Sequence, residues 1–413
     1  MKLKLTLATA SALGLLMGGA ALANDGNEAY TSQNGERNTL QIQQNQGTIG
    51  NNRVGTFAAP ILQQGDDNTF KELQQSGAGY YGVGGNVIEA GKQLGDKNTF
   101  TSTYGGSTSG YNEITNMLQQ GGSNAASVLR NDGKNGLVGT LRQHGDSNKM
   151  SIIQTGDGNQ IISATQDGSK NGDGAGTGVN RWNRGTQLWQ IGTGNVITEA
   201  SITGSNNLGA HPTSGPYANV DGYAVLDIKQ NGTGNGDVFS IARMTGSNGN
   251  QIVIDQFGNH NQFSVIQGDA VSDTRNFARL FQTGDYNEAL IDQSGSFNSA
   301  LMTFDGDSNG LVGLTGVAGA LVSGSGGLLF AGTAIQDSSS SLTGNGNSLT
   351  YDVVGNSNQF AFAQIGGNNT ISGLVGDTGA SNGNQAAVLQ SGSNNTSSFS
   401  QNGGGSNNIS VSQ

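Results

Sequence analysis

The sequence contains no cysteine and has few charged, apolar or proline residues, and each shortage excludes a kind of protein. Without cysteine there can be neither disulfide staples nor thiolate chemistry. Charged residues make up 11% and apolar residues 33% of the 413 residues, whereas globular domains usually have about 25% and about 45–50%. Such a chain lacks the apolar material for a thick globular core. The formal net charge of −11 argues against nucleic acid as a partner, because phosphate binding needs clustered Lys and Arg.

What the chain has instead is glycine and amide side chains at regular places. Glycine accounts for 70 residues, and the string Gln-x-Gly-x-x-Asn occurs fourteen times. It opens at Gln33, Gln63, Gln93, Gln119, Gln143, Gln154, Gln166, Gln190, Gln230, Gln256, Gln282, Gln293, Gln364 and Gln390. A spacing of 11 residues recurs between neighbouring strings, and a fixed period is the signature of a repeat architecture.

The repeat is most regular in residues 250–309. Each unit begins at Asn, has apolar residues two and four positions later and, with one exception at Phe304, Gln six positions later. Asn250, Ile252, Ile254 and Gln256 form one such unit. Apolar residues at alternate positions, followed by a Gly, predict a half-buried strand that ends in a tight turn.

Alternation along a strand places the Asn, the two apolar residues and the Gln of a unit on the same face. Two 11-residue half-repeats then make one rung, meaning one two-strand turn of a solenoid. The sequence therefore predicts an all-β fold, a cross-β β-solenoid of about twelve rungs. A buried amide without a partner costs roughly 1–3 kcal/mol, so we expect each Asn or Gln to donate to one neighbour in the stack and accept from the other.

Three sets of residues are expected to build this solenoid. The structural amide ladder is expected at Asn148, Gln154, Gln166, Asn250, Gln256, Asn261, Gln267, Gln282, Asn287, Gln293, Asn358, Gln364, Asn384, Gln390, Asn407 and Gln413. The inward apolar residues are expected to be Ile252, Ile254, Phe263, Val265, Leu280, Ile291, Phe360, Phe362, Val388, Ile409 and Val411. The turn glycines, which tolerate positive φ, are expected at Gly145, Gly156, Gly258, Gly284, Gly295, Gly366 and Gly392.

Residues 1–23 have the features of a secretion signal. Lys2 and Lys4 give a basic start, an apolar run follows, and Ala21 and Ala23 form a small-residue cleavage motif. The apolar run is too short to span a bilayer. We therefore expect an exported protein.

Segments that break the period define the rest of the expected organisation. Solenoid repeats are expected over 24–309 and 342–413, with inserted loops at 77–85, 172–185 and 208–222. Residues 310–341 form an apolar, Gly-rich insertion, which is expected to be a degenerate rung or a surface loop rather than a membrane span, because glycine disfavours helices.

No motif in the sequence indicates an enzyme, a metal site or a cofactor site. The histidines are interpreted as solvated residues at or near turns, without a partner constellation: His144, His211 and His260. Gly/Asp turns at Gly156 and Gly172 faintly resemble calcium-binding turns but lack the nonapeptide period such sites need. An aromatic and basic cluster suggests either a sugar-binding spot or, more simply, a packed loop: Arg181, Trp182, Arg184 and Trp189.

The pattern Gln-x4-Asn-x5-Gln in paired halves, behind a signal segment, resembles the curlin repeat of curli subunits over nearly the whole chain after residue 23. The resemblance implies an extracellular functional amyloid, a structural subunit of fibres in the biofilm matrix that serve surface adhesion. It also implies self-polymerisation, an outer-membrane export pore, a nucleator subunit and a periplasmic chaperone. The chain departs from the family in having many more repeats and only Asn24, Asp25 and Gly26 before the first repeat.

The alternative interpretation is a monomeric secreted β-solenoid adhesin or a sugar- or ice-binding rod. It would require a regular ladder of one residue type on the outward positions, and residues 250–309 show none. The pattern begins at Asn27 and runs to Gln413 without a capping helix, proline or charge beyond either end. Unpaired strand edges recruit further chains, so we expect the end strands to be the growth surface.

Overall fold

The computed structural model describes residues 28–46, 52–76, 86–105, 112–131, 135–169, 171, 186–203, 226–237, 239–245, 250–268, 275–310, 313–339, 346–375, 382–401 and 406–413. The expected signal segment and the three expected inserted loops lie outside these residues. The chain divides into two compact units, Met1–Ile202 (unit 1) and Thr203–Gln413 (unit 2).

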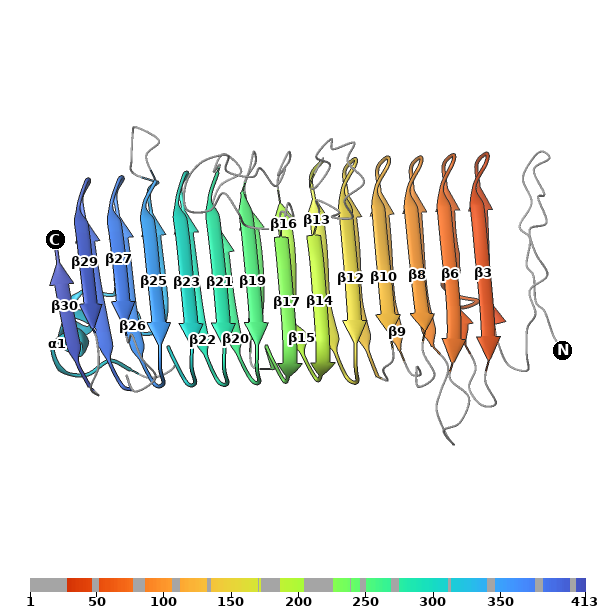
Figure 1. Ribbon diagram of the computed structural model, residues 1–413. Coiled ribbons are helices and arrows are strands. Elements are labelled where there is room, and N and C mark those ends of the chain that lie inside the picture. The colour runs from red at the N-terminus through yellow and green to blue at the C-terminus, as the bar shows by residue number, and fades with distance from the viewer. Residues whose placement is uncertain are drawn as a thin grey trace, which may run out of the picture. The chain divides into compact units, whose positions relative to one another are not determined.

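In unit 1, strands that follow one another along the chain alternate between two layers, and each layer is a parallel sheet (Figure 1). The β2 layer contains β1 (Glu28–Ala29), β2 (Thr31–Asn34), β4 (Arg53–Val54), β5 (Ile61–Gln64), β7 (Val87–Leu94), β9 (Glu113–Gln120), β11 (Leu137–His144), β13 (Gln160–Asp167), β15 (Val196–Ile197) and β16 (Glu199–Thr203). The β3 layer contains β3 (Thr39–Gln46), β6 (Thr69–Ser76), β8 (Thr99–Gly105), β10 (Ala125–Asn131), β12 (Lys149–Thr155) and β14 (Thr186–Thr193).

Unit 2 has the same two-layer plan and one helix. The β17 layer contains β17 (Leu226–Thr233), β19 (Gln251–Phe257), β21 (Phe277–Thr283), β23 (Ser299–Asp305), β25 (Ser348–Val354), β27 (Thr370–Val375) and β29 (Thr396–Gln401). The β18 layer contains β18 (Ser240–Thr245), β20 (Gln262–Gln267), β22 (Glu288–Ser294), β24 (Thr333–Asp337), β26 (Gln359–Ile365), β28 (Gln385–Ser391) and β30 (Asn408–Ser412). The helix is α1 (Gly316–Gly324).

Stacked rungs place like residues on like residues. In the pairing of β19 with β21, Ile254 lies beside Leu280 and Gln256 beside Gln282. The alternation of buried and half-exposed residues along β21 follows the period expected for a strand with one inward face. The predicted all-β β-solenoid is confirmed.

Four successive strands of the β2 layer depart from simple alternation. In β7, β9, β11 and β13 two consecutive residues in mid-strand face outward, as Glu89 and Ala90 do in β7. The distance from the opening residue to Gln is correspondingly seven residues rather than six, as between Asn86 and Gln93, and in β11 the opening residue is Gly136 instead of Asn. Each strand thus has one extra outward residue, which we call a bulge although the neighbouring strands have it too. The bulges stack in register, because Gly139 of β11 is left out of the strand pairing with both neighbours, together with Thr115 of β9 and Ile162 of β13.

The cores of the two units are filled differently. Within the described part of unit 1, Phe70 and Phe100 stack with ring centroids 5.1 Å apart in a core that is otherwise mainly aliphatic. Unit 2 contains a larger aromatic cluster in its later rungs, formed by Phe304, Tyr351, Phe360, Phe362 and Phe399.

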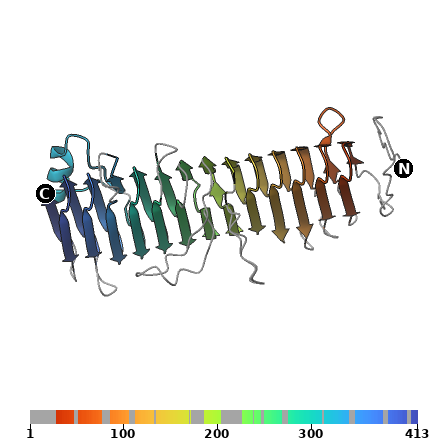
Figure 2. The same cartoon turned by 90° about the horizontal axis from the view of Figure 1, so that it is seen from above.

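The apolar insertion 310–341 is both a rung strand and a helical cover. β24 pairs with β22 and β26, which agrees with the expected degenerate rung. The segment also forms a helix that was not expected, α1, which lies beside the outer face of the β18 layer near Gln413 (Figure 2). Leu329 packs there on Ala361 and Ala363, whose side chains point outward from β26 and are fully buried.

Candidate functional site: amide ladders and end strands

Buried glutamines of the β18 layer form one hydrogen-bonded ladder. Nε2 of Gln267 donates to Oε1 of Gln293 at 2.8 Å, and every later step uses the same pair of atoms. The steps run from Gln293 to Gln336 (2.7 Å), to Gln364 (2.8 Å), to Gln390 (3.1 Å) and to Gln413 (3.0 Å). Each glutamine donates to the next one along the chain, so the ladder has a direction.

Equivalent ladders occur in the other layers. The β2 layer of unit 1 carries one from Gln63 to Gln93, Gln119, Gln143 and Gln166, with steps of 2.8–2.9 Å. The β3 layer links Gln154 to Gln190 at 2.7 Å. The β17 layer links Gln230, Gln256 and Gln282, and Phe304 in the next strand ends this series.

The second amide proton of most ladder glutamines bonds across the solenoid. Nε2 of Gln267 donates to the carbonyl oxygen of Gln251 in the opposite layer at 2.8 Å, and Gln293 donates in the same way to Phe277 at 2.9 Å. Both N–H groups of such a glutamine are therefore satisfied, one along the stack and one across it. Oε1 of Gln154 and of Gln267, the first members of their ladders, is buried without a partner, as is Oε1 of Gln401 on the last described strand of the β17 layer. In each case the preceding strand of the layer offers no amide at that place.

Asparagines form the expected side-chain bond at some steps, such as Asn309 to Asn287 at 3.0 Å, but they stack mainly through a backbone N–H. Oδ1 of Asn261 accepts the backbone N–H of Asn287 at 2.9 Å, and Asn287 accepts that of Asn309 at 3.1 Å. The side-chain Nδ2 of Asn261 donates to the carbonyl oxygen of the turn residue Gly284 at 2.8 Å. Side-chain to side-chain stacking was predicted for both amide types and dominates for Gln. Asn instead bonds mainly to backbone groups, at the start of the next strand and in the neighbouring turn. The same backbone bond links Asn250, Asn358, Asn384 and Asn407 to their neighbours, and Asn148 to Asn124.

The turn glycines are required for two reasons. Their φ values are positive at Gly145, Gly156, Gly258, Gly284, Gly295, Gly366 and Gly392, between 81° and 116°. A Cβ on Gly258 would also lie 2.1 Å from the carbonyl oxygen of Gly284 in the next rung. The residue after the glycine adds a further stacking bond, since Oδ1 of Asp285 accepts the backbone N–H of Asn259 at 2.8 Å.

Burial separates the interior rungs from the end strands. The inward apolar residues Ile252, Ile254, Phe263, Val265, Leu280, Ile291, Phe360, Phe362 and Val388 are fully buried. On β30, by contrast, Ile409 and Val411 are only half-buried, and Asn407 and Gln413 are exposed. On β3, at the first described rung of unit 1, Leu40 is half-buried in the same way. The end strands therefore present inward-type apolar side chains to solvent.

The helix α1 holds the last described strand in place from the side. Oδ1 of Asn408 accepts the backbone N–H of Ala318 at 2.7 Å, and its Nδ2 donates to the carbonyl oxygen of Thr315 at 2.8 Å. This contact could not be predicted from the local repeat pattern, because it joins β30 to a segment 90 residues earlier.

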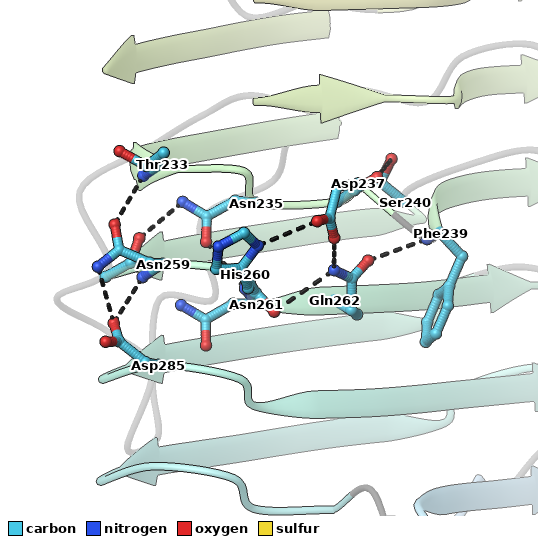
Figure 3. Close-up of polar contacts among 12 residues, drawn as sticks. Thr233, Asn235, Asp237, Phe239, Ser240, Asn259, His260, Asn261, Gln262 and Asp285 are labelled. Carbon is cyan, nitrogen blue, oxygen red and sulfur yellow. Dashed lines mark hydrogen bonds and ion pairs between the residues drawn. The ribbon is translucent and has the colours of Figure 1, made fainter. Parts of the chain in front are cut away.

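Each described histidine has an aspartate beside it. Nδ1 of His144 lies 2.7 Å from Oδ1 of Asp167, and Nδ1 of His260 lies 3.0 Å from Oδ2 of Asp237. Asp237 also accepts a hydrogen bond from Gln262, which in turn accepts the backbone N–H of Phe239 at 2.9 Å (Figure 3). Sequence reasoning missed these partners, because they lie one rung away and 23 residues apart along the chain. These contacts connect neighbouring rungs at the turns.

Several other candidate site residues lie outside the described residues or are not brought together with other site residues. His211, Trp182 and the Gly/Asp turn at Gly172 lie outside them, whereas Trp189 is half-buried on β14. No group of three or more His, Asp or Glu side chains suited to a metal ion occurs in the described ranges. Among the helices of those ranges, none has the length and apolar character needed to cross a membrane.

Carboxyl groups on the outer faces of unit 2 have raised pKa values. Burial, with a smaller contribution from Asp255, raises the pKa of Asp227 to about 7. Burial also raises the pKa of Asp255, against the opposing charges of Arg279 and Lys229. Burial therefore shifts both carboxyl groups towards the neutral form, relative to the same groups in water.

Comparison with known proteins supports the repeat assignment. The family model described as the curlin associated repeat matches residues 274–309, which include β21, β22 and β23. No curated protein and no solved structure matches the chain. The match falls on the most regular part of the ladder, where the Asn, inward apolar, Gln and turn Gly residues occupy the places described above. Residues 274–309 thus match the curlin associated repeat, and the same residue spacing recurs in other described rungs of both units.

Proposed function

We propose that the protein is a structural subunit of extracellular, curli-like amyloid fibres and that it polymerises by end-to-end stacking of rungs. The observation that carries this proposal is the half-burial of Ile409 and Val411 on β30, while equivalent residues in interior rungs are fully buried. Covering apolar side chains contributes roughly 25 cal/mol per Å² of area removed from water. A further rung supplied by a second copy would bury them as they are buried inside the stack.

The amide ladders give such a contact its direction. Gln413 receives a hydrogen bond from Gln390, so its own amide is the next donor in the series. At the other end, Gln33 donates to Gln63 and is an exposed first member of its ladder. Every described ladder runs in this direction, so amide donors at one end of a stack complement amide acceptors at the other end, head to tail. A heterologous contact of this kind does not close, so it produces filaments.

The fibre role extends to localisation and partners. The expected signal segment 1–23 would direct export through the periplasm and outer membrane, and the fibres would lie at the cell surface, in the biofilm matrix, where they serve adhesion. A curli-type export pore, a nucleator subunit and a periplasmic chaperone are the partners this role requires. The role is structural and needs no cofactor.

The test is a pair of double variants on the same strand. Ile409→Lys with Val411→Lys puts two charges on the inward face of β30, whereas Ser410→Lys with Ser412→Lys puts two charges on its exposed outward face. Burying an unpaired charge is far more costly than leaving it in water. We expect seeded fibre growth to stop for the inward variant and to continue for the outward one. Equal growth of both variants would contradict end-to-end stacking.

A second candidate, the sugar- or ice-binding rod, has one observation in its favour. Thr39, Thr69 and Thr99 stack in register on the outward face of the β3 layer. The ladder continues into Ala125, and Lys71 stands two residues beyond Thr69, so the array is short. Inhibition of ice recrystallisation, or retention on an insoluble glucan, that is lost in Thr69→Lys would favour this candidate.

A further inference from the structure

The strand that a second copy must supply can be identified from the order of strands at the end of unit 2. β30 follows β29 along the chain and lies in the opposite layer, so the β17 layer ends with β29 and the β18 layer with β30 among the described strands (Figure 1). Strands of a two-layer solenoid are added to the two layers in turn. The next strand position after β30 is therefore on β29, not on β30 itself.

At the other end, the first half-rung of unit 1 is β1 with β2, and the second is β3. We propose that, in the end-to-end fibre proposed above, β1 and β2 of the incoming copy pair with β29, and β3 of that copy pairs with β30. This inference rests on the proposed self-assembly and specifies its contact. Each copy's β2 layer then prolongs its neighbour's β17 layer, and its β3 layer prolongs the β18 layer.

Strand matching supports this arrangement. Counted from the Asn that opens each half-rung, Leu40 and Ile42 of β3 fall on Ile409 and Val411 of β30. All of these side chains are half-buried, so their stacking covers apolar surface on both copies. In the same register Thr31 falls on Phe399, which is also half-buried on β29.

The competing arrangement places β1 and β2 directly on β30. It would set Ala29 and Thr31, rather than Leu40 and Ile42, against Ile409 and Val411. It would also leave a strand-wide gap over β29, whose backbone N–H and C=O groups would face that gap without strand partners. Buried backbone groups without hydrogen bonds are rare because they are costly. The proposed arrangement leaves no gap.

The absence of cysteine makes the contact directly testable, because engineered thiols are the only ones present. In-register neighbours in a parallel stack lie about 4.8 Å apart, within the Cα separation of about 4.4–6.8 Å that a disulfide spans. Two proteins with one cysteine each are mixed, grown into fibres and oxidised, so that any disulfide dimer of unlike chains is intermolecular. The outward residues Ser410, Ser398, Gln41 and Tyr30 each occupy the third place after the opening Asn.

We expect dimers when Ser410→Cys is mixed with Gln41→Cys and when Ser398→Cys is mixed with Tyr30→Cys. We expect no dimers above background when Ser410→Cys is mixed with Tyr30→Cys, which is the matched control. Each single variant oxidised alone gives the background.

Three results would overturn the inference. Fibres that cross-link only in the Ser410→Cys and Tyr30→Cys mixture would show stacking on β30 and leave the proposed function standing. Fibres that cross-link in none of the mixtures would show a different contact between copies. If no mixture gave fibres or dimers, while unmodified protein also stayed monomeric, the proposed function would fail together with the inference.

Discussion

Units 1 and 2 share their ladders and turns but differ in the shape and filling of their strands. In unit 1, four stacked strands carry a bulge, whereas β20, β22, β26 and β28 of unit 2 keep a distance of six residues from Asn to Gln, as between Asn287 and Gln293. The glycine turn is the same in both, since Gly145 and Gly258 have φ values of 100° and 116°. The comparison teaches that the amide ladder and the turn define the repeat. The strand between them can change length if its stacked neighbours change with it.

The units also differ in their outer-face electrostatics. In unit 1, Arg37 bonds to Asp67 and lowers the pKa of that carboxyl group. In unit 2, burial raises the pKa values of Asp227, Asp255, Glu288 and Asp352. Acid is therefore expected to favour the folded form of unit 2 in particular.

The largest effect is expected from removing a single bulge residue. Deletion of Gly139 gives β11 the unit 2 strand length while β9 and β13 keep the extra residue, so half of the strand loses its register. We expect a loss of roughly 3 kcal/mol or more, the range of severe core lesions, seen as fast amide hydrogen exchange in β9, β11 and β13. Thr140→Ala keeps the length and is the control. Unchanged protection after the deletion would show that the bulges need not match.

A smaller but still large effect is expected from breaking a glutamine ladder. Gln293→Leu leaves the donor of Gln267 and the acceptor of Gln336 without their partner, at roughly 1–3 kcal/mol for each buried group. Gln143→Leu should cost about as much in unit 1, because its two ladder bonds have the same geometry. Urea unfolding of both variants measures this.

The matched control for the ladder is Ser294→Ala, the neighbour of Gln293 that points outward. We expect it to unfold like the unmodified protein. A loss in only one of the two Gln variants would mean that the ladders are not equivalent in the two units.

Turn substitutions are expected to cost less and to cost the same in both units. Gly145→Ala and Gly258→Ala each bring a Cβ to within 2.0–2.1 Å of a carbonyl oxygen in the next rung, and strain at positive φ is of order 1–3 kcal/mol. Gly194, with φ of 65° and nothing within 4 Å of an added Cβ, is the control. If Gly194→Ala lowered the unfolding midpoint as much as the other two, close stacking of turns would not be the cause.

The smallest effect is a change in pH dependence. The pKa of Asp227 is about 7 in the folded protein against 3.8 ordinarily, so folding binds a proton between these values. Stability from this group is highest below pH 3.8, falls as the pH rises and is constant above about 7. Asp227→Asn should flatten the urea midpoint between pH 5 and pH 8, whereas the exposed turn variant Asp146→Asn should not. If the urea midpoint of Asp227→Asn changed with pH as steeply as that of the unmodified protein, other groups would be the cause of the pH dependence.

Much of the fold could be predicted from sequence because one local pattern determines it. Asn250, Ile252, Ile254 and Gln256 are all buried where alternation puts them, and the turn glycine Gly258 has the positive φ that its position requires. Register then follows, since a shift by one residue would turn every one of these side chains outward.

Other features depend on neighbours in space and were not predictable in the same way. The seven-residue spacing from Asn86 to Gln93 was visible, but its consequence, a bulge, requires the adjacent strands to have it too. The helix α1 forms in a Gly-rich segment of poor helix propensity because it covers Ala361 and Ala363. Alanine at both outward positions of β26 was the one available signal of a covered face.

The measurement closest to the central claim is X-ray fibre diffraction from the purified protein, combined with sedimentation of the same sample. Stacked rungs predict sedimenting fibres with a meridional reflection at about 4.8 Å and an equatorial one at about 10 Å. For the double variant Ile409→Lys with Val411→Lys, we expect no sedimenting fibres and neither reflection. A protein that shows strand signal yet sediments as a monomer at all concentrations would contradict self-assembly through the end strands.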